Sequence, residues 1–563
     1  MRFDDGKDKS GCGGVLLRLA RDKRANVMVI GAMAMFPLAG MVGGGLDLSR
    51  MYITKTRLQH ACDAAVLAGR RTMGGGSWAF NNNAANAEAV RFFEGNWQAG
   101  SYGATNEVKS FTENNGVVRG TASVQLPMSL MRIFGQTTRT ISVACDAQMR
   151  LLNTDVMFVL DTTGSMAQTI PGDTGTKMTA LRSSVKCFYQ ILAQLDITDQ
   201  DCEGAEPTGG VGPDVQLRFG FVPYSSNVNV GRLLPTAYMP DSWTYQSRTY
   251  QNARDDGDPI WTYEPRVIDI SGLKNGATGW NDELTVPRIG DDAENRRIRW
   301  DGCIEERATV PRATYYPIPS EAKDLDIDSV PVAGDVTTQW KPVLPDVQYL
   351  RNIRSNLNQA RFEPTPNTTR QYLNARNYSY ACPTESRRLR SYAAADGGTA
   401  NFMNYVNALN PVGGTYHDIG MIWGQRLLSP TGIFAADNRV SATGGAIERH
   451  LIFMTDGDTD TSEFNSGAYG IPWHDRRQFG AGTAPTKEMN DEQVDRRFEA
   501  LCTRGRGPFT IWVIGFGALS TDTTNRLRNC ASPGRFFAAS NAAGLQRSFR
   551  DIAEQIGQLR LRN

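Results

Sequence analysis

Five oxygen-bearing side chains lie at points of the sequence from which they could bind one hard metal ion. They are Asp161, Thr163, Ser165, Thr415 and Asp456. The first three form an Asp-x-Thr-x-Ser turn directly after the apolar run 156–160, and the last follows the apolar run 451–454. Mg²⁺ prefers oxygen ligands in an octahedral array and usually keeps some waters. We therefore expect a divalent-cation site, with Mg²⁺ as the first choice and Ca²⁺ or Mn²⁺ as alternatives.

Strands and helices must alternate around these residues if the ligands are to meet. Four mostly apolar runs predict strands, and the first is continuously hydrophobic, as in a strand buried on both faces. They are residues 156–160, 217–222, 451–454 and 509–516. Helical spacing follows the first run and closes the chain at 545–559. Repeated βα units predict an α/β fold with a doubly wound, mostly parallel sheet, in which ligands gather beyond the carboxyl ends of the strands.

The alternation is lost between about 233 and 400. This segment is rich in proline, tyrosine and charged residues and holds five of the ten tryptophans. A structureless loop of this length is improbable in a compact domain, so we interpret it as an inserted subdomain. Cys303 and Cys382 could cross-link it. We expect most of its aromatic residues to form a small core of its own, with partner binding as the alternative.

An uncharged stretch lies between Val27 and Leu46, near the N-terminus. About 20 helical residues span roughly 30 Å, the thickness of a bilayer core. Basic residues gather on one side only, at 18–24, which predicts a cytoplasmic N-terminus. The bulk of the chain would then lie outside the cytoplasm, in the periplasm of a Gram-negative cell. A cleaved signal peptide and a buried soluble helix are the alternatives, but the apolar run is long for the first and its flank too one-sided for the second.

Cysteine usage agrees with export. Of nine cysteines only Cys12 precedes the apolar stretch, and the other eight permit four disulfides in an oxidising compartment. No Cys-x-x-Cys pair occurs, which argues against a zinc site. The net charge of +1 gives no general electrostatic basis for binding nucleic acid.

The region after the apolar stretch continues as a helix and then becomes rich in strand-forming residues. A long N-terminal helix followed by a small sheet is the layout of a pilin-like module, with a generic stalk as the alternative. The predicted organisation has a cytoplasmic basic tail, a transmembrane helix, a pilin-like module and an α/β domain. Their residues are 1–25, 26–46, 47–152 and 153–563, the last containing the insertion at about 233–400.

The five oxygen-bearing residues resemble the metal-ion-dependent adhesion site of von Willebrand factor A domains. The resemblance implies a central sheet flanked by helices and a cation whose open position is filled by an acidic residue of a protein partner. Thr163 stands where the family usually has serine and keeps the hydroxyl. The long separation between Ser165 and Thr415 departs from the family pattern, and the insertion must account for it.

Three further stretches resemble TadE/TadG-like proteins of tight-adherence (Flp) pilus systems, and the last two resemble the TadG type. They are residues 24–65, 423–430 and 511–531. The resemblance implies a disulfide between Cys502 and Cys530, and other pilus-assembly or minor pilin proteins as partners. Processed prepilins carry glycine at the cleavage point and glutamate shortly after, where this chain has Ala25 and Ile30. We therefore predict an uncleaved, single-pass anchor in the bacterial inner membrane, with exposure at the cell surface as an open alternative.

Enzyme signatures do not appear. Lys177 is not part of a Walker A sequence, and the four histidines show no His-Glu-x-x-His spacing. His417 lies two residues after Thr415 and could lie near the metal, although a solvated loop histidine is the default interpretation. We predict a non-enzymatic adhesion or assembly protein. The alternatives are an envelope sensor or scaffold unrelated to pili and a metal-dependent hydrolase.

Overall fold

The computed structural model describes residues 23–559 apart from several short gaps. The gaps are 74–77, 115–116, 149–152, 171, 194–215, 254–256, 258, 352–365, 368–371, 393–397, 442–445, 481 and 484. The chain divides into two compact units, unit 1 (Met1–Met149) and unit 2 (Arg150–Asn563). The basic tail proposed for residues 1–25 lies almost wholly outside the described residues.

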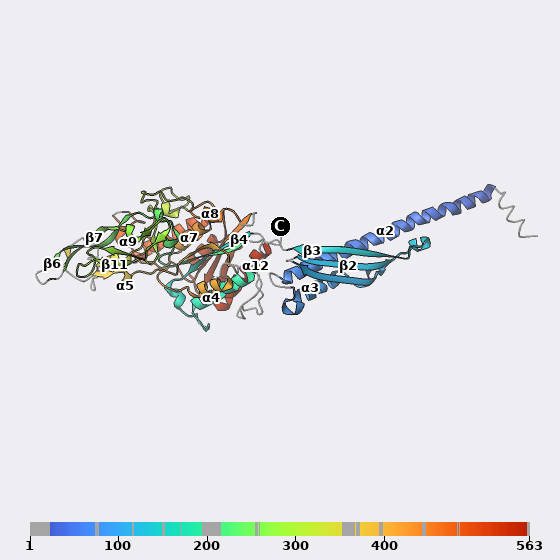
Figure 1. The fold of residues 1–563 in the computed structure, drawn as a ribbon, viewed down its shortest axis with the longest axis horizontal. Helices are drawn as coiled ribbons and strands as arrows, with labels where there is room; N and C mark the ends of the chain where they lie inside the picture. Colours follow the sequence, from blue (N-terminus) through green and yellow to red (C-terminus); the bar gives the residue numbers. More distant parts are fainter. Residues whose placement is uncertain are drawn as a thin grey trace, which may run out of the picture. The chain divides into compact units, whose positions relative to one another are not determined.

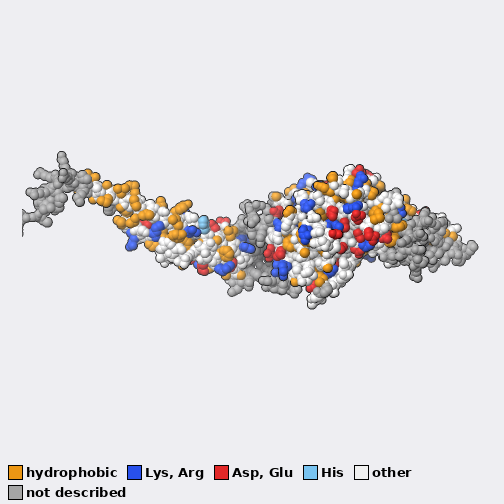
Figure 2. Space-filling view, turned by 180° about the vertical axis from the view of Figure 1, so that it is seen from behind, with side chains coloured by type: hydrophobic (Ala, Val, Ile, Leu, Met, Phe, Trp, Pro, Cys, Tyr) orange, Lys and Arg blue, Asp and Glu red, His pale blue; other side chains and the backbone are white. Residues whose placement is uncertain are grey.

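Unit 1 is built on one long helix, α2 (Lys23–Met73), which contains the whole uncharged stretch. Within the described ranges it is the one helix long and apolar enough to cross a membrane. Its first half exposes side chains such as Met33 and Met41, and Figure 2 shows hydrophobic side chains along it. The predicted N-terminal apolar helix is therefore present.

The second half of α2 packs on helix α3 (Phe80–Asn96) and on a three-stranded antiparallel sheet. Its strands are β1 (Thr105–Asn114), β2 (Val117–Pro127) and β3 (Thr138–Gln148), with short 3-10 turns η1 (Ser101–Gly103) and η2 (Met131–Phe134). Alternate residues of β2 are buried against the helices, as a sheet with one solvated face requires. A disulfide joins Cys62 of α2 to Cys145 of β3.

Unit 2 is centred on a six-stranded mixed sheet of order β17-β5-β4-β18-β19-β20. The parallel strands are β4 (Asn153–Asp161), β5 (Leu217–Tyr224), β18 (Ile447–Thr455), β19 (Thr510–Phe516) and β20 (Phe536–Ala539). The edge strand β17 (Arg387–Arg390) runs antiparallel to β5. Because β17 belongs to this sheet, the insertion ends before Arg387 and not near residue 400.

Helices cover both faces of this sheet (Figure 1). One face packs on α4 (Lys177–Leu192), α6 (Gly398–Asn407) and α12 (Ala542–Leu559). The other packs on α7 (His417–Leu428), α10 (Lys487–Gly505) and α11 (Thr521–Cys530). Along β4, Phe158 faces the first layer and Val159 the second, which is why this strand is apolar without interruption.

The insertion is made of short strands and turns. Its larger hairpin is β6 (Ser242–Ala253) with β7 (Pro259–Asp269), to which β15 (Pro366–Asn367) adds. The smaller strands are β8 (Lys274–Asn275), β9 (Gly279–Trp280), β10 (Glu283–Val286), β11 (Arg296–Arg299), β12 (Ile304–Glu305), β13 (Lys341–Pro342), β14 (Tyr349–Arg351) and β16 (Tyr372–Asn374). The short helices of unit 2 are η3 (Gly164–Ala167), η4 (Gly231–Leu233), η5 (Thr236–Tyr238), η6 (Ser271–Leu273), η7 (Lys323–Leu325), η8 (Pro345–Val347), α5 (Ala375–Tyr378), α8 (Ala435–Asn438) and α9 (Pro472–Asp475).

The expectation that the insertion has its own core is wrong. Trp261, Trp300 and Trp340 are fully buried in the same hydrophobic cluster as Val159 of β4 and Trp423 of α7. The rings of Trp340 and Trp423 lie 5.1 Å apart. The insertion therefore shares one continuous core with a face of the central sheet.

Candidate metal centre

Asp161 is the last residue of β4, at the carboxyl edge of the sheet, and is fully buried. The next residue, Thr162, donates its backbone N–H to the carbonyl of Tyr224 on β5 at 3.0 Å. The carbonyl of Thr162 accepts a hydrogen bond from the backbone N–H of Val412 at 2.7 Å. Two neighbouring segments are thereby bonded to the turn. Thr163 then donates its own N–H to Asp161 Oδ1 at 2.9 Å, which fixes the carboxylate.

Hydrogen bonds join four of the five predicted ligands directly. The hydroxyls of Thr163 and Ser165 lie 2.9 Å apart, and Ser165 Oγ donates to Asp456 Oδ1 at 2.7 Å. Asp456 follows the end of β18, which lies beside β4, so the two acidic residues meet at one edge. The structure thus brings these four residues together at one edge of the sheet.

Thr415 joins the group through its loop. The N–H of Gly164 donates to the carbonyl of Gly413 at 2.9 Å, and Thr415 and Asp460 exchange two backbone hydrogen bonds. Gly413 has φ +76°, and a Cβ there would lie 2.7 Å from Ala381 Cβ, so this position requires glycine. Among the described residues Thr415 is buried beside the Asp161 turn, but its hydroxyl is not bonded to the other four.

The two carboxylates share one buried environment. Burial, and then the negative charge of Asp456, raise the pKa of Asp161 to about 7. Thr455 Oγ1 donates to Asp161 Oδ2 at 2.7 Å and Tyr224 OH lies 3.4 Å from the same oxygen. Such a pair favours a bound positive charge, because a cation would relieve the repulsion and replace lost hydration.

A cationic side chain that sequence reasoning missed contacts this pair. Lys177 Nζ donates to Asp456 Oδ2 at 2.8 Å, and its side chain is only 13% exposed. Lys177 is the first residue of α4, where the helix dipole disfavours a positive charge. That unfavourable placement was the signal in the sequence that a nearby carboxylate holds it.

His417 is not solvated, so the default interpretation of it was wrong. Its ring is 1% exposed and its two nitrogens face the hydroxyls of Thr455, at 3.0 Å, and Thr459, at 3.2 Å. Burial lowers the pKa of His417 to about 3, so the ring is neutral at pH 7. It orients Thr455, which in turn holds Asp161.

The donor set fits a hard cation rather than a soft one. Two carboxylates and three hydroxyls supply oxygen only, which suits Mg²⁺ and excludes a thiolate or imidazole site. In the described part of the chain no group of three or more His, Cys, Asp or Glu side chains could hold a metal ion. A cation here would therefore depend on hydroxyl ligands and water as well as on Asp161 and Asp456.

An open cavity of 910 Å³ lies beside the Thr415 loop. One side is formed by that loop, at Gly413 and Gly414, and the other by the insertion, at Asp301, Arg376 and Cys382. The insertion therefore leaves an open space next to the loop.

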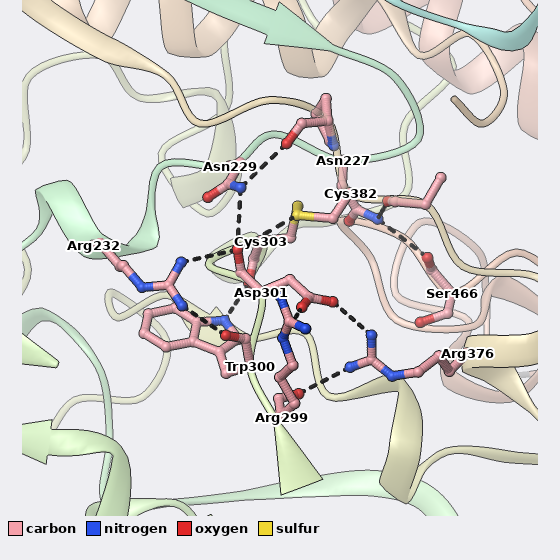
Figure 3. Close-up of a disulfide and its surroundings, with 12 residues drawn as sticks. Asn227, Asn229, Arg232, Arg299, Trp300, Asp301, Cys303, Arg376, Cys382 and Ser466 are labelled. Atoms are coloured by element: carbon pink, nitrogen blue, oxygen red, sulfur yellow. Dashed lines mark hydrogen bonds and ion pairs between the residues drawn. A yellow bond between two sulfur atoms is a disulfide. The ribbon is translucent and has the colours of Figure 1, made fainter. Parts of the chain in front are cut away.

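Figure 3 shows how the insertion side of this cavity is held. The Cys303–Cys382 disulfide crosses it, and Arg376 bonds Asp301 at 2.7 Å. Asn229 Nδ2 donates to the Asp301 carbonyl at 3.1 Å. Covalent and ionic links thus fix the wall of the cavity.

Residues 26–86 match the model of the family described as putative Flp pilus-assembly TadE/G-like. The match covers most of α2 and the start of α3, and it confirms the resemblance expected from the N-terminal stretch. No curated protein matches the chain.

Solved structures similar to the chain include three bacterial proteins. The pilus adhesin SpaC from Lactobacillus rhamnosus GG shares 11% identity at a TM-score of 0.31, over 80% of this chain and 34% of SpaC. The vWF domain of the type V pili tip protein Mfa5 from Porphyromonas gingivalis shares 11% identity at a TM-score of 0.29, over 73% of this chain and 98% of that domain. A von Willebrand factor type A protein from Catenulispora acidiphila shares 12% identity at a TM-score of 0.25, over 82% of this chain and 52% of that protein's chain. The chain thus spans about a third of SpaC, and the proposals below rest on its own residues.

The Trp-Gly-x-Arg stretch, on which part of the TadG resemblance rested, has a structural role in α7. Trp423 Nε1 and Arg426 Nη1 both donate to Glu306 Oε1 of the insertion, at 2.6 and 2.8 Å. A Cβ on Gly424 would lie 2.3 Å from Val159 Cγ2, so glycine lets α7 approach β4 closely. This stretch joins the sheet, α7 and the insertion.

Disulfides are present in both units, as expected of an exported chain. The implied Cys502–Cys530 bond is present and links α10 to α11. Cys187 is also disulfide-bonded, whereas Cys202 lies outside the described residues.

Proposed function

We propose that this protein is a membrane-anchored, non-enzymatic component of Flp-type pilus assembly or adhesion. Unit 2 would act as a von Willebrand factor A-type domain with a doubly wound sheet, and unit 1 as a pilin-like module. The family match at residues 26–86 supports the pilus assignment, and the apolar part of α2 supports the anchor. We further propose a cytoplasmic N-terminus, a periplasmic bulk and an uncleaved helix. If N-terminal sequencing showed that the mature protein begins at Asn26, the proposal of an uncleaved helix would be contradicted.

The observation that carries the binding proposal is the partly buried Asp161–Thr163–Ser165–Asp456 chain of hydrogen bonds. These residues, with Thr415, would hold Mg²⁺, and the ion when bound would offer an open position to an acidic residue of a protein partner. Thr455 orients Asp161, and Lys177 already neutralises part of the negative charge. The open cavity beside the Thr415 loop gives a partner room to approach.

A hydrolase is less well supported, because the histidine that would be its base is held neutral and hydrogen-bonded. His417 is the nearest histidine along the chain, but it is buried, bonded at both nitrogens, and has a pKa lowered to about 3. An envelope sensor or scaffold remains the second candidate. Loss of surface pili on deletion of the gene would separate the pilus role from that one.

The direct test measures Mg²⁺ binding and partner capture by the full-length protein in detergent. We expect wild type to bind Mg²⁺ and to retain a protein from envelope extracts, and EDTA to release it. Asp161→Ala should abolish Mg²⁺ binding and partner capture, and so should Ser165→Ala, which removes only a hydroxyl group. Asp522→Ala, which removes an exposed carboxylate on α11, is the matched control and should change neither. Capture that survives both EDTA and Asp161→Ala would refute the metal bridge.

A further inference from the structure

The connection between β2 and β3 carries an unusual group of exposed apolar side chains. We call residues 128–135 the hairpin tip; they include η2. Leu130, Ile133 and Phe134 are 37%, 65% and 41% exposed. Soluble loops rarely present several large apolar side chains together, so this group points to a contact surface.

The hairpin tip packs against the last turns of the apolar stretch of α2 (Figure 1). A Cβ on Gly40 would lie 3.0 Å from the Phe134 ring, and one on Gly43 would lie 2.6 Å from Leu130 Cβ. Glycine at these positions therefore makes room for the hairpin tip. The small residues of this stretch thus receive the chain's own loop.

Asp47 fixes the hairpin tip in this place. Its buried carboxylate accepts the backbone N–H groups of Ser129, Leu130 and Met131 at 2.9, 3.0 and 2.9 Å. Arg50, one turn further along α2, donates to the carbonyl of Pro127 at 3.3 Å. The backbone donors are thus satisfied internally, and the hairpin tip presents mainly apolar side chains outward.

The position along α2 says what these side chains would meet. Seven residues separate Gly40 from Asp47, which is about 10 Å of helix. If the uncharged stretch fills the hydrocarbon core, Phe134 lies about 10 Å inside the boundary that Asp47 marks. Interfacial elements bury their apolar faces to roughly this depth, about 5–10 Å. The exposed Arg132 and Arg139 could extend to lipid phosphates from there.

We propose that the hairpin tip is a second membrane contact, which enters the interfacial layer of the bilayer that holds α2. It rests on the proposed anchoring of α2 and adds a lipid-binding surface to it. A lipid surface is the occupant, because the hairpin tip continues the apolar face of the membrane helix and is flanked by arginines. Two contacts on one rigid unit would set the depth and tilt of α2 and keep the sheet close to the membrane surface.

The experiment uses the full-length protein, with Cys12→Ser, in phosphatidylcholine vesicles. An environment-sensitive dye is attached at Ile133→Cys, and phosphatidylcholine with a nitroxide near the headgroup serves as quencher. Thr121→Cys, an exposed site on β2 six residues before Pro127 and so about 20 Å away along the strand, is the control. Met33→Cys, 72% exposed on α2, reports the anchor itself, with a nitroxide deeper in the acyl chain.

We expect a blue-shifted dye at Ile133 and at least threefold stronger quenching there than at Thr121. Quenching at Met33 with none at Ile133 would overturn the hairpin-tip proposal and leave the anchor intact. Equal quenching at Ile133 and Thr121 would overturn it as well, because contact would not be confined to the hairpin tip. Absence of quenching at Met33 would overturn the anchor and the hairpin-tip proposal together.

Discussion

Replacing Glu306 by Gln should destabilise unit 2 strongly. Glu306 is fully buried, and four N–H groups donate hydrogen bonds to its carboxylate. Trp423 and Arg426 bond Oε1 at 2.6 and 2.8 Å, and Trp340 Nε1 bonds Oε2 at 3.0 Å. Burial alone would raise the pKa of Glu306, but Arg426 and Arg307 outweigh it and lower the pKa. The carboxylate is therefore charged in the folded protein.

The expected loss follows from two effects of the amide. It removes the charge that neutralises buried Arg426, and breaking a buried ion pair typically costs about 3–5 kcal/mol. In addition, the amide N–H₂ must face other donors whichever way the side chain turns. Arg426→Met combined with Glu306→Gln should recover at least about 1 kcal/mol relative to the sum of the single changes, because the unpaired charge is then removed.

Guanidinium unfolding of the full-length, oxidised protein in detergent, followed by tryptophan fluorescence, measures this. Eight of the ten tryptophans lie in unit 2, so the signal reports that unit. Glu283→Gln is the control, since its ion pair with Arg297 is solvent-exposed and should change stability by less than about 0.5 kcal/mol. A loss below about 1 kcal/mol for Glu306→Gln would refute the reasoning.

Three further predictions follow from single side chains. Lys177→Met should tighten Mg²⁺ binding about tenfold by calorimetry, because it removes the competing charge on Asp456; weaker binding would contradict this. Gly424→Ala should cost about 1–3 kcal/mol in the same unfolding assay, since the new methyl group overlaps Val159, and an unchanged midpoint would disprove the close approach. Burial, and then nearby Arg476, lower the pKa of His474 to about 4. The unfolded chain therefore binds more protons than the folded one between about pH 6.5 and 4, and stability decreases as the pH is lowered through this range, by up to about 1.4 kcal/mol per pH unit. His474→Gln should flatten this slope, and a variant with the same slope as wild type would contradict the prediction.

Local features of the site could be predicted from the sequence, because short-range chemistry determines them. An Asp-x-Thr-x-Ser turn after a continuous apolar run places Asp161 at the carboxyl edge of a buried strand whatever the rest of the chain does. Asp456 could be placed by the same argument. The Asp161–Asp456 arrangement therefore emerged from strand ends alone, and neither residue depends on the insertion for its place.

Long-range contacts could not be predicted in this way. Nothing in the composition of the insertion indicates that Trp340 packs on Trp423, which lies 83 residues further along the chain, so a separate core was the simpler expectation. Lys177 was judged only against a phosphate-binding sequence, and its contact with Asp456 spans 279 positions. The loop that fills the space over Gly40 is also distant in sequence, since Phe134 lies 94 positions further along the chain. Each of these contacts depends on which elements the sheet topology brings together.

The Glu306 contacts also bear on how the candidate metal centre is held. Thr415 lies two residues before α7, and α7 is fixed at Trp423 and Arg426 by the insertion and at Asp418 by Arg497 of α10, at 3.0 Å. A shift of α7 would therefore separate buried charges, which is costly. The Thr415 loop is thus preorganised, and the insertion contributes to the site through this helix. It follows that Glu306→Gln should weaken Mg²⁺ binding as well as stability, although Glu306 bonds α7 and none of the five candidate ligands.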